Sequence, residues 1–401
     1  MNELGRGICF PLGFKASGIA GGIKPSGRLD TAIITSERPA AAAAVFTTNR
    51  VRAASVIVSM KHFGLTKEQR AVILTAGNAN AATGPEGIKT AELMCSLLAE
   101  KLCIPTEQVL IAQTGLIGKT LRRDVALSAI EKAHMRLSQS GGIDAGQAIL
   151  TTDTKAKICE RSYKIGDNTI RLGAVAKGAA MLSPSLATML ATVTSDVAIQ
   201  PELLQAALNE AVSDSFHLLI VDGCRSTNDS VFVLTNGASD SATITAASSN
   251  AYKLFSTALT AVLQDLAMQM ASDAEGSTKL MTVHVTGALT CNDARLAARA
   301  VVSSLLVKCS IAGGIAYWGR ILSELGASGA EFNQDDVAIY YGPHLLSKNG
   351  VAFPADEDAV QEYMKNRTIE ITANIGQGAH DATAYGCDLT HAYVAENMTK
   401  S

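Results

Sequence analysis

Thr188 lies in a run of small and apolar residues, Lys177 to Leu190, and its hydroxyl is a candidate nucleophile. Small residues beside a threonine permit a tight backbone bend and the close approach of other groups. A threonine needs a base to become a nucleophile, and one such base is its own α-amine. The run contains no His, Asp or Glu. Because a cut between Ala187 and Thr188 would supply the missing base, we interpret Thr188 as a nucleophile exposed by self-cleavage.

A second chemical feature is the pair Thr114-Gly115, which follows a predicted strand at Val109 to Ala112. Acyl transfer needs donors aimed at the oxyanion, and a hydroxyl beside an unobstructed glycine N–H would provide two. Each motif also has a plain structural interpretation. An Ala-Thr pair is more often a buried turn than a catalytic site, and Thr-Gly after a strand is usually a turn.

The context of Thr188 resembles the family of ornithine acetyltransferases, the glutamate N-acetyltransferases of arginine biosynthesis. The family signature is Lys-Gly-x-Gly-Met, then Pro, then Met-Ala-Thr-Met-Leu. It is matched by Lys177, Gly178, Met181, Pro184, Ala187, Thr188, Met189 and Leu190, whereas Ala180 and Leu186 depart from it. Further blocks match in order along nearly the whole chain, including Val45 to Asn49, Ala76 to Asn80, Val221-Asp222-Gly223, Ser226 to Asp229, Trp318-Gly319-Arg320 and Gly386 to Thr390.

The resemblance implies roles for individual residues. Thr188 is the nucleophile, and Thr114 and Gly115 stabilise the oxyanion. The implied substrate contacts are Thr151, Lys177, Thr188, Glu275, Asn397 and Ser401. These residue types also occur without any function, as solvated surface charges, turn hydroxyls or a frayed terminus.

The resemblance also implies the reaction. Acetyl passes from N-acetylornithine to Thr188, ornithine leaves, and glutamate takes the acetyl group in a ping-pong mechanism. We expect small-molecule substrates and no metal or cofactor, with acetyl-CoA left open as an alternative acetyl donor. Cleavage would give an α chain, 1–187, and a β chain, 188–401, and the implied assembly is α2β2.

Two departures from the family pattern bear on specificity. Ile315-Ala316-Tyr317 stands where the family has Asp-Pro-Asn, and Ala180 replaces a glycine. Other readings therefore stay open: an acyltransferase with a different donor or acceptor, or a self-processed amidase or aminopeptidase in which water resolves the acyl-enzyme. A non-catalytic binding protein is the third alternative, and retention of Thr188 with Thr114-Gly115 argues against it.

Composition excludes several other classes. The chain has 401 residues, 47% of them hydrophobic, and a formal net charge of -3, which is typical of a globular protein and gives no basic patch for nucleic acid or anionic membranes. We find no signal peptide and no apolar run long enough to span a membrane. Eight scattered cysteines without a Cys-x-x-Cys pair argue against zinc and favour reduced thiols in the cytoplasm.

Strand-like and helical patterns interleave, which predicts an α/β or α+β fold. The resemblance narrows this to stacked β-sheets with helices on the outer faces. No linker is evident, and only the segment from Lys177 to Val197 divides the chain. Among the expected elements are strands at 31–35, 54–59, 71–75, 109–112, 190–197, 231–234, 279–285, 368–371 and 381–385, a hairpin around Asp167-Asn168, a loop at 138–143, and helices at 85–102, 124–137, 201–212, 249–271 and 293–307.

Overall fold

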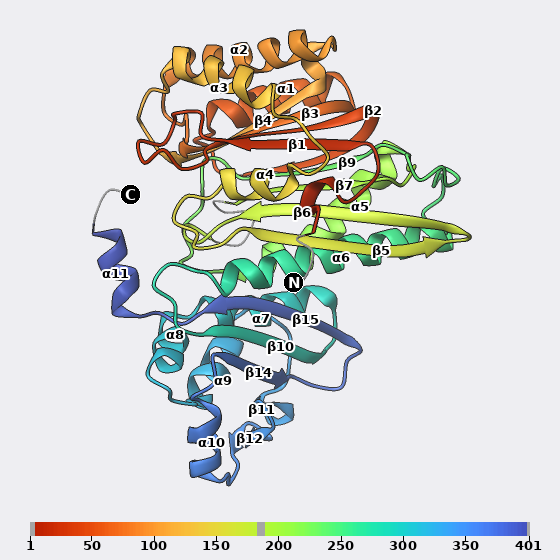
Figure 1. Cartoon of the computed structure of the whole chain (residues 1–401). Helices are drawn as coiled ribbons and strands as arrows, with labels where there is room; N and C mark the ends of the chain where they lie inside the picture. Colours follow the sequence, from red (N-terminus) through yellow and green to blue (C-terminus); the bar gives the residue numbers. More distant parts are fainter. Residues whose placement is uncertain (1–4, 183–188, 399–401) are drawn as a thin grey trace.

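The computed structural model describes residues 5–182 and 189–398. Within this range the strands form two sheets, one of eight strands and one of seven, stacked with layers of helices (Figure 1). The predicted mixed α/β fold of stacked sheets is confirmed.

The first sheet has the order β4-β3-β2-β9-β7-β6-β5, with β1 paired to β2. Its pairs are mostly antiparallel, but β3–β4 and β7–β9 are parallel. The strands are β1 (Phe14–Ile19), β2 (Thr31–Phe46), β3 (Glu68–Asn78), β4 (Val109–Leu116), β5 (Lys157–Ile165), β6 (Asn168–Lys177), β7 (Leu190–Ser195) and β9 (Ser230–Thr235). β5 and β6 form the predicted hairpin.

The long strand β2 lets this sheet form two layers. Its first part pairs with β1 and β3, its last part pairs with β9, and its pairing with β3 shifts register between Thr35 and Ala40. Apolar residues from both parts of the sheet share one core, in which Leu110 of β4 lies in the same cluster as Val175 of β6 and Leu190 of β7. The sheet therefore brings β4 and β7 together, and Cα atoms of the two strands approach within 8 Å.

Helices cover both outer surfaces of this folded sheet. α1 (Ala54–Leu65), α2 (Gly84–Leu102) and α3 (Arg123–His134) pack on the β3 and β4 side. α4 (Gly142–Ala148) instead lies between the two layers, against β1, β2 and β6 (Figure 1). α5 (Pro201–Ser213) and α6 (Asn250–Ala271) cover the β7 and β9 side (Figure 1). α6 also reaches the second sheet, because its core includes Leu280 and Cys387 from that sheet.

The second sheet has the order β13-β12-β11-β14-β10-β15-β8. Its strands are β8 (Leu219–Ile220), β10 (Leu280–Ala288), β11 (Ala338–Tyr341), β12 (His344–Lys348), β13 (Val351–Ala352), β14 (Thr368–Asn374) and β15 (His380–Cys387). The remaining helices are α7 (Cys291–Ser303), α8 (Leu305–Ala312), α9 (Trp318–Ala327), α10 (Glu357–Tyr363) and α11 (His391–Asn397). α7, α8 and α9 share a core with the sheet, opposite α6 (Figure 1). No helix in the described range is both long and apolar enough to cross a membrane.

The strand predicted at 54–59 is wrong, because these residues begin helix α1. Its β-branched residues favour a strand locally, but tertiary contacts decide otherwise. Ser59 Oγ donates to Ile111 O at 2.6 Å and accepts from Ile111 N at 2.7 Å, and His62 Nδ1 lies 2.8 Å from Val109 O. The helix therefore satisfies the outer backbone groups of β4, which ends the hydrogen-bonded order of its sheet.

Two other boundaries also differ from prediction. The single helix expected at 293–307 is two helices, because Ser304 has an extended conformation (ψ 119°) and its side chain accepts a hydrogen bond from Val307 N as the N-cap of α8. The loop expected at 138–143 is shorter, since α4 begins at Gly142.

We predict that Leu263→Ala on α6 lowers the free energy of unfolding by about 2–5 kcal/mol, because it opens a cavity in a fully buried core. The matched control is Leu254→Ala on the same helix, where the side chain is 38% exposed. Urea unfolding of both variants measures the difference. Equal losses at the two positions would contradict the central packing assigned to α6.

Candidate functional site

The start of β7 places the chain next to the predicted nucleophile. Leu190 pairs with Lys177 of β6 on one side and with Ser230 of β9 on the other. Met189 N donates a 2.9 Å hydrogen bond to Asp229 Oδ1. The residue after Thr188 is therefore fixed between two strands, although Thr188 and Ala187 lie outside the described residues.

Thr114 and Gly115 lie at the carboxyl end of β4, as the sequence predicts. Thr114 is 1% exposed, and its Oγ1 has no hydrogen-bond partner within the described part of the chain. A buried hydroxyl without a partner calls for an explanation, and an absent substrate oxygen is one. Gly115 has a φ of +132°, and a Cβ there would lie 2.4 Å from Gly77 C, so only glycine fits.

Asn228 connects this strand end to the start of β7. Its Nδ2 donates to Gln113 O at 2.8 Å and to Ala79 O at 2.6 Å. The next residue, Asp229, holds Met189. The predicted oxyanion donors and the predicted nucleophile segment are thus tied to the same short loop before β9.

Lys177 is buried at the end of β6 inside a network of charges. Its Nζ lies 3.7 Å from Asp153 Oδ2, and Lys157 Nζ lies 2.6 Å from both Asp153 Oδ1 and Asp273 Oδ2. Burial raises the pKa of Asp153, but the charges of Lys177 and Lys157 outweigh burial and lower that pKa to about 2. Burial lowers the pKa of Lys177, while Asp153 opposes this effect.

Thr151 is held next to the same network, since its N–H donates to Asp153 Oδ2 at 3.1 Å. Gly178 N also donates to Asp153, at 2.7 Å, which joins the loop of Thr151 to the end of β6. The structure therefore brings Thr151 and Lys177 together around one carboxylate.

Glu275, in the loop between α6 and β10, lies close to the end of β6. Its backbone N–H donates to Ala179 O at 2.9 Å, two residues after Lys177. Its Oε2 accepts a hydrogen bond from Asn397 Nδ2 at 2.9 Å, so α11 folds back onto the site. The charge of Glu275 raises the pKa of Lys177 and so opposes the effect of burial. Ser401 lies outside the described residues.

The sequence analysis missed the supporting carboxylate Asp222. Its Oδ2 accepts hydrogen bonds from Met181 N at 2.7 Å and from Tyr393 OH at 3.2 Å. It thus holds Met181, which has a φ of +52°, next to α11. The only sequence signal was the match of Val221-Asp222-Gly223 to the family, which gives position but no partner.

Lys24 is a second missed residue. A Cβ added to Gly77 would lie only 2.8 Å from Lys24 Cγ, and Gly77 pairs with Gly115 across β3 and β4. The Lys24 side chain therefore lies against the predicted oxyanion site. Burial lowers the pKa of Lys24 to about 8, with Asp30 and Asp153 opposing the shift and Lys177 adding to it.

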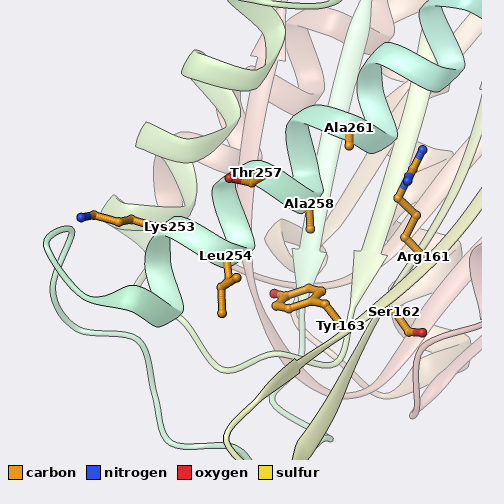
Figure 2. A pocket seen from close by; sticks show the side chains of 8 residues that line it. All are labelled: Arg161, Ser162, Tyr163, Lys253, Leu254, Thr257, Ala258 and Ala261. Carbon is orange, nitrogen blue, oxygen red and sulfur yellow. The ribbon is translucent and has the colours of Figure 1, made fainter.

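A hollow of about 420 Å³ between β5 and α6 is a separate feature, and none of the described predicted site residues lines it. Figure 2 shows Lys253 and Arg161 extending to opposite sides of this hollow, and Arg161 lies 3.7 Å from Asp265. The two cations do not converge as an anion site requires. Its lining is Arg161, Ser162, Tyr163, Lys253, Leu254, Thr257, Ala258 and Ala261. In residues 5–182 and 189–398, no group of three or more His, Cys, Asp or Glu could hold a metal ion.

The end of β4 carries a hydroxyl without a described partner beside a glycine N–H, and the end of β6 carries a buried lysine influenced by a glutamate. These groups fit an acyl-transfer enzyme of mixed α/β fold. The model of the ArgJ family matches residues 15–399, and the chain belongs to this family. Both the predicted family and its enzyme class, an acetyltransferase of arginine biosynthesis, are confirmed.

Two individual relatives match over almost the full length of the chain. The chain is 43% identical over 399 residues to the arginine biosynthesis bifunctional protein ArgJ of Symbiobacterium thermophilum, covering 99% of each. It is 42% identical over 404 residues to the protein of the same name from Synechococcus sp., covering 98% of this chain and 97% of the relative. The crystal structure of ArgJ from Bacillus halodurans is 38% identical with a TM-score of 0.49, and covers 52% of this chain and 96% of its own.

We predict that Lys24 reacts with amine-directed reagents with a midpoint near pH 8, because its pKa is lowered to about 8. An ordinary lysine has a pKa of about 10.4, so Lys24 loses its positive charge about two pH units earlier. Low-dose labelling at pH values from about 6 to 11, followed by peptide mass mapping, measures the midpoint of Lys24 reactivity and compares it with that of a model lysine peptide. A Lys24→Arg variant identifies the signal, and a midpoint coinciding with that of the model peptide would refute the assignment.

Proposed function

We propose that this chain transfers an acetyl group from N-acetylornithine to glutamate through an acetyl ester on Thr188. The observation that carries the proposal is the buried Thr114 hydroxyl without a described partner, joined through Gln113 and Asn228 to the start of β7. The ArgJ family membership supports the same reaction. The proposed enzyme works in the cytoplasm as an α2β2 assembly of chains 1–187 and 188–401.

In the proposed mechanism Thr188 Oγ attacks the acetyl carbonyl while the Thr188 α-amine takes the proton. An α-amine has an ordinary pKa of about 7.7–8.0 and can serve as a base near neutral pH. Thr114 Oγ1 and Gly115 N–H donate to the oxyanion. Ornithine leaves with the proton, glutamate attacks the ester, and Thr188 is regenerated.

The charges around the site support an amino-acid substrate. Lys177 offers a cation for an α-carboxylate, and Glu275 offers an anion for an amino group. Lys177 is only 2% exposed, so a substrate carboxylate that reached it would leave water and pair with a buried cation. Charge-assisted hydrogen bonds of this kind are strong and favour a specific contact. No cofactor takes part in the proposed steps, and acetyl-CoA enters only as an alternative acetyl donor to Thr188.

We expect purified protein to consist of two fragments divided between Ala187 and Thr188, and Thr188→Ala to remain a single chain. Intact mass spectrometry measures this directly. A wild-type chain that stays full-length after prolonged incubation would exclude the N-terminal nucleophile.

The acceptor test separates transfer from hydrolysis. With N-acetylornithine and saturating glutamate, we expect N-acetylglutamate to exceed free acetate, because Lys177 and Glu275 favour an amino acid over water. Quantifying both products by mass spectrometry decides the matter. If acetate dominates, the enzyme is an amidase, and replacing N-acetylornithine by acetyl-CoA in the same assay tests that donor.

Thr114→Val should lower kcat by a factor of about 100–1000, because it removes one oxyanion donor while keeping the side-chain volume. KM should change little. The matched control is Thr192→Val, since Thr192 Oγ1 on β7 is likewise buried without a partner in the described range. Replacing that hydroxyl by a methyl group should leave kcat unaltered, and an unaltered kcat in Thr114→Val would place the oxyanion site elsewhere.

A further inference from the structure

Self-cleavage poses a problem that acetyl transfer does not. Before the chain is cut, the nitrogen of Thr188 belongs to a peptide bond and cannot act as a base. Another group must take the hydroxyl proton, and the run from Lys177 to Leu190 contains no His, Asp or Glu. The run contains no carboxyl or imidazole for this step, and neighbouring elements of the fold can supply one.

Asp229 is held by a hydrogen bond to Met189, next in sequence to the proposed cleavage site. Its Oδ1 accepts from Met189 N at 2.9 Å, and Met189 N is bonded directly to the carbonyl carbon of Thr188. Asp229 is therefore anchored to the peptide bond that joins Thr188 to Met189. Asp229 itself is fully buried.

The second oxygen of Asp229 is free to act. Oδ2 is buried and has no hydrogen-bond partner among the described residues. The hydroxyls of Thr47 and Ser226 lie near enough to lower the pKa of the carboxyl, but Thr47 Oγ1 donates instead to Ser226 O, at 2.7 Å. A buried carboxylate oxygen without a partner is costly, which points to a function rather than to stability.

The other carboxylates around the site are already occupied. Asp153 is held by two lysines and by Gly178 N. Asp222 accepts from Met181 N and Tyr393 OH, and Glu275 accepts from Asn397. Asp229 alone among these four combines an unpartnered buried oxygen with a bond to the residue after Thr188.

We propose that the Asp229 carboxylate is the proton-transfer group of self-cleavage, an inference that rests on the proposed Thr188 nucleophile. It takes the proton from Thr188 Oγ as this oxygen forms a bond to the carbonyl carbon of Ala187. It returns the proton to the Thr188 nitrogen as the Ala187–Thr188 peptide bond breaks. The ester that results is opened by water, which leaves a carboxylate on Ala187, a hydroxyl on Thr188 and a free α-amine.

The electrostatic surroundings give this role a pH dependence. Burial raises the pKa of Asp229 well above its ordinary value, and the bond from Met189 N, the charge of Lys177 and the two nearby hydroxyls oppose this shift. The carboxylate form therefore becomes populated only as the pH rises through this elevated pKa. The rate of self-cleavage should rise over the same range.

The experiment follows cleavage of freshly translated full-length chain by gel and intact mass at several pH values. We expect Asp229→Asn to slow cleavage by a factor of about 100 or more, the contribution typical of general acid–base groups, and to abolish the rise with pH. The matched control is Asp196→Asn, a fully buried aspartate just beyond the far end of β7 that bonds Arg171. It should cleave at the wild-type rate with the wild-type pH profile.

Thermal unfolding shows whether each variant is folded. If Asp229→Asn does not fold, Asp229→Glu keeps a carboxylate and decides the matter, since its cleavage profile should shift along the pH axis. Cleavage of folded Asp229→Asn at the wild-type rate, or a coincident profile for Asp229→Glu, would overturn the role of Asp229 and leave the acetyltransferase intact. Failure of the wild-type chain to cleave at any pH would instead count against Thr188 as an N-terminal nucleophile.

Discussion

The hydrogen bonds of one short loop, Asn228-Asp229, hold the site together. Asn228 Nδ2 donates to two backbone carbonyls, Gln113 O near the end of β4 and Ala79 O in the loop after β3, and Asp229 accepts from Met189 N. Because buried backbone groups need partners, these bonds link the end of β4, which carries the proposed oxyanion donors, to the start of β7.

Burial of charge is the second constraint. The network of Lys177, Asp153, Lys157 and Asp273 removes four charges from water, and such networks seldom increase stability over an apolar core. This network instead holds its four side chains in fixed positions. Asp153 joins the loop of Thr151 to the end of β6, and Asp273 links both to the end of α6, so Lys177 is held in one place.

Local sequence patterns predicted most of the elements, because the continuous apolar runs at β3 and β4 and the Asp167-Asn168 turn of the β5–β6 hairpin are strong signals. They failed at α1, where Ser59 and His62 bond to β4, a contact that no local pattern contains. The candidate site divides in the same way. The family motifs located Thr114, Lys177 and Glu275, but Asp229 and Asp222 act through partners about 40 residues earlier in the chain, which only the fold brings near.

The raised pKa of Asp229 reconciles its proposed role with the later chemistry. After cleavage the α-amine of Thr188 must be neutral to act as a base, and a carboxylate beside it would favour its protonated form. Because burial raises the pKa of Asp229 well above its ordinary value, the charged form is disfavoured and that effect is weakened. In the proposed mechanism self-cleavage occurs once per chain, whereas every acetyl transfer needs the neutral amine. One buried carboxyl can therefore promote the first reaction without impeding the second.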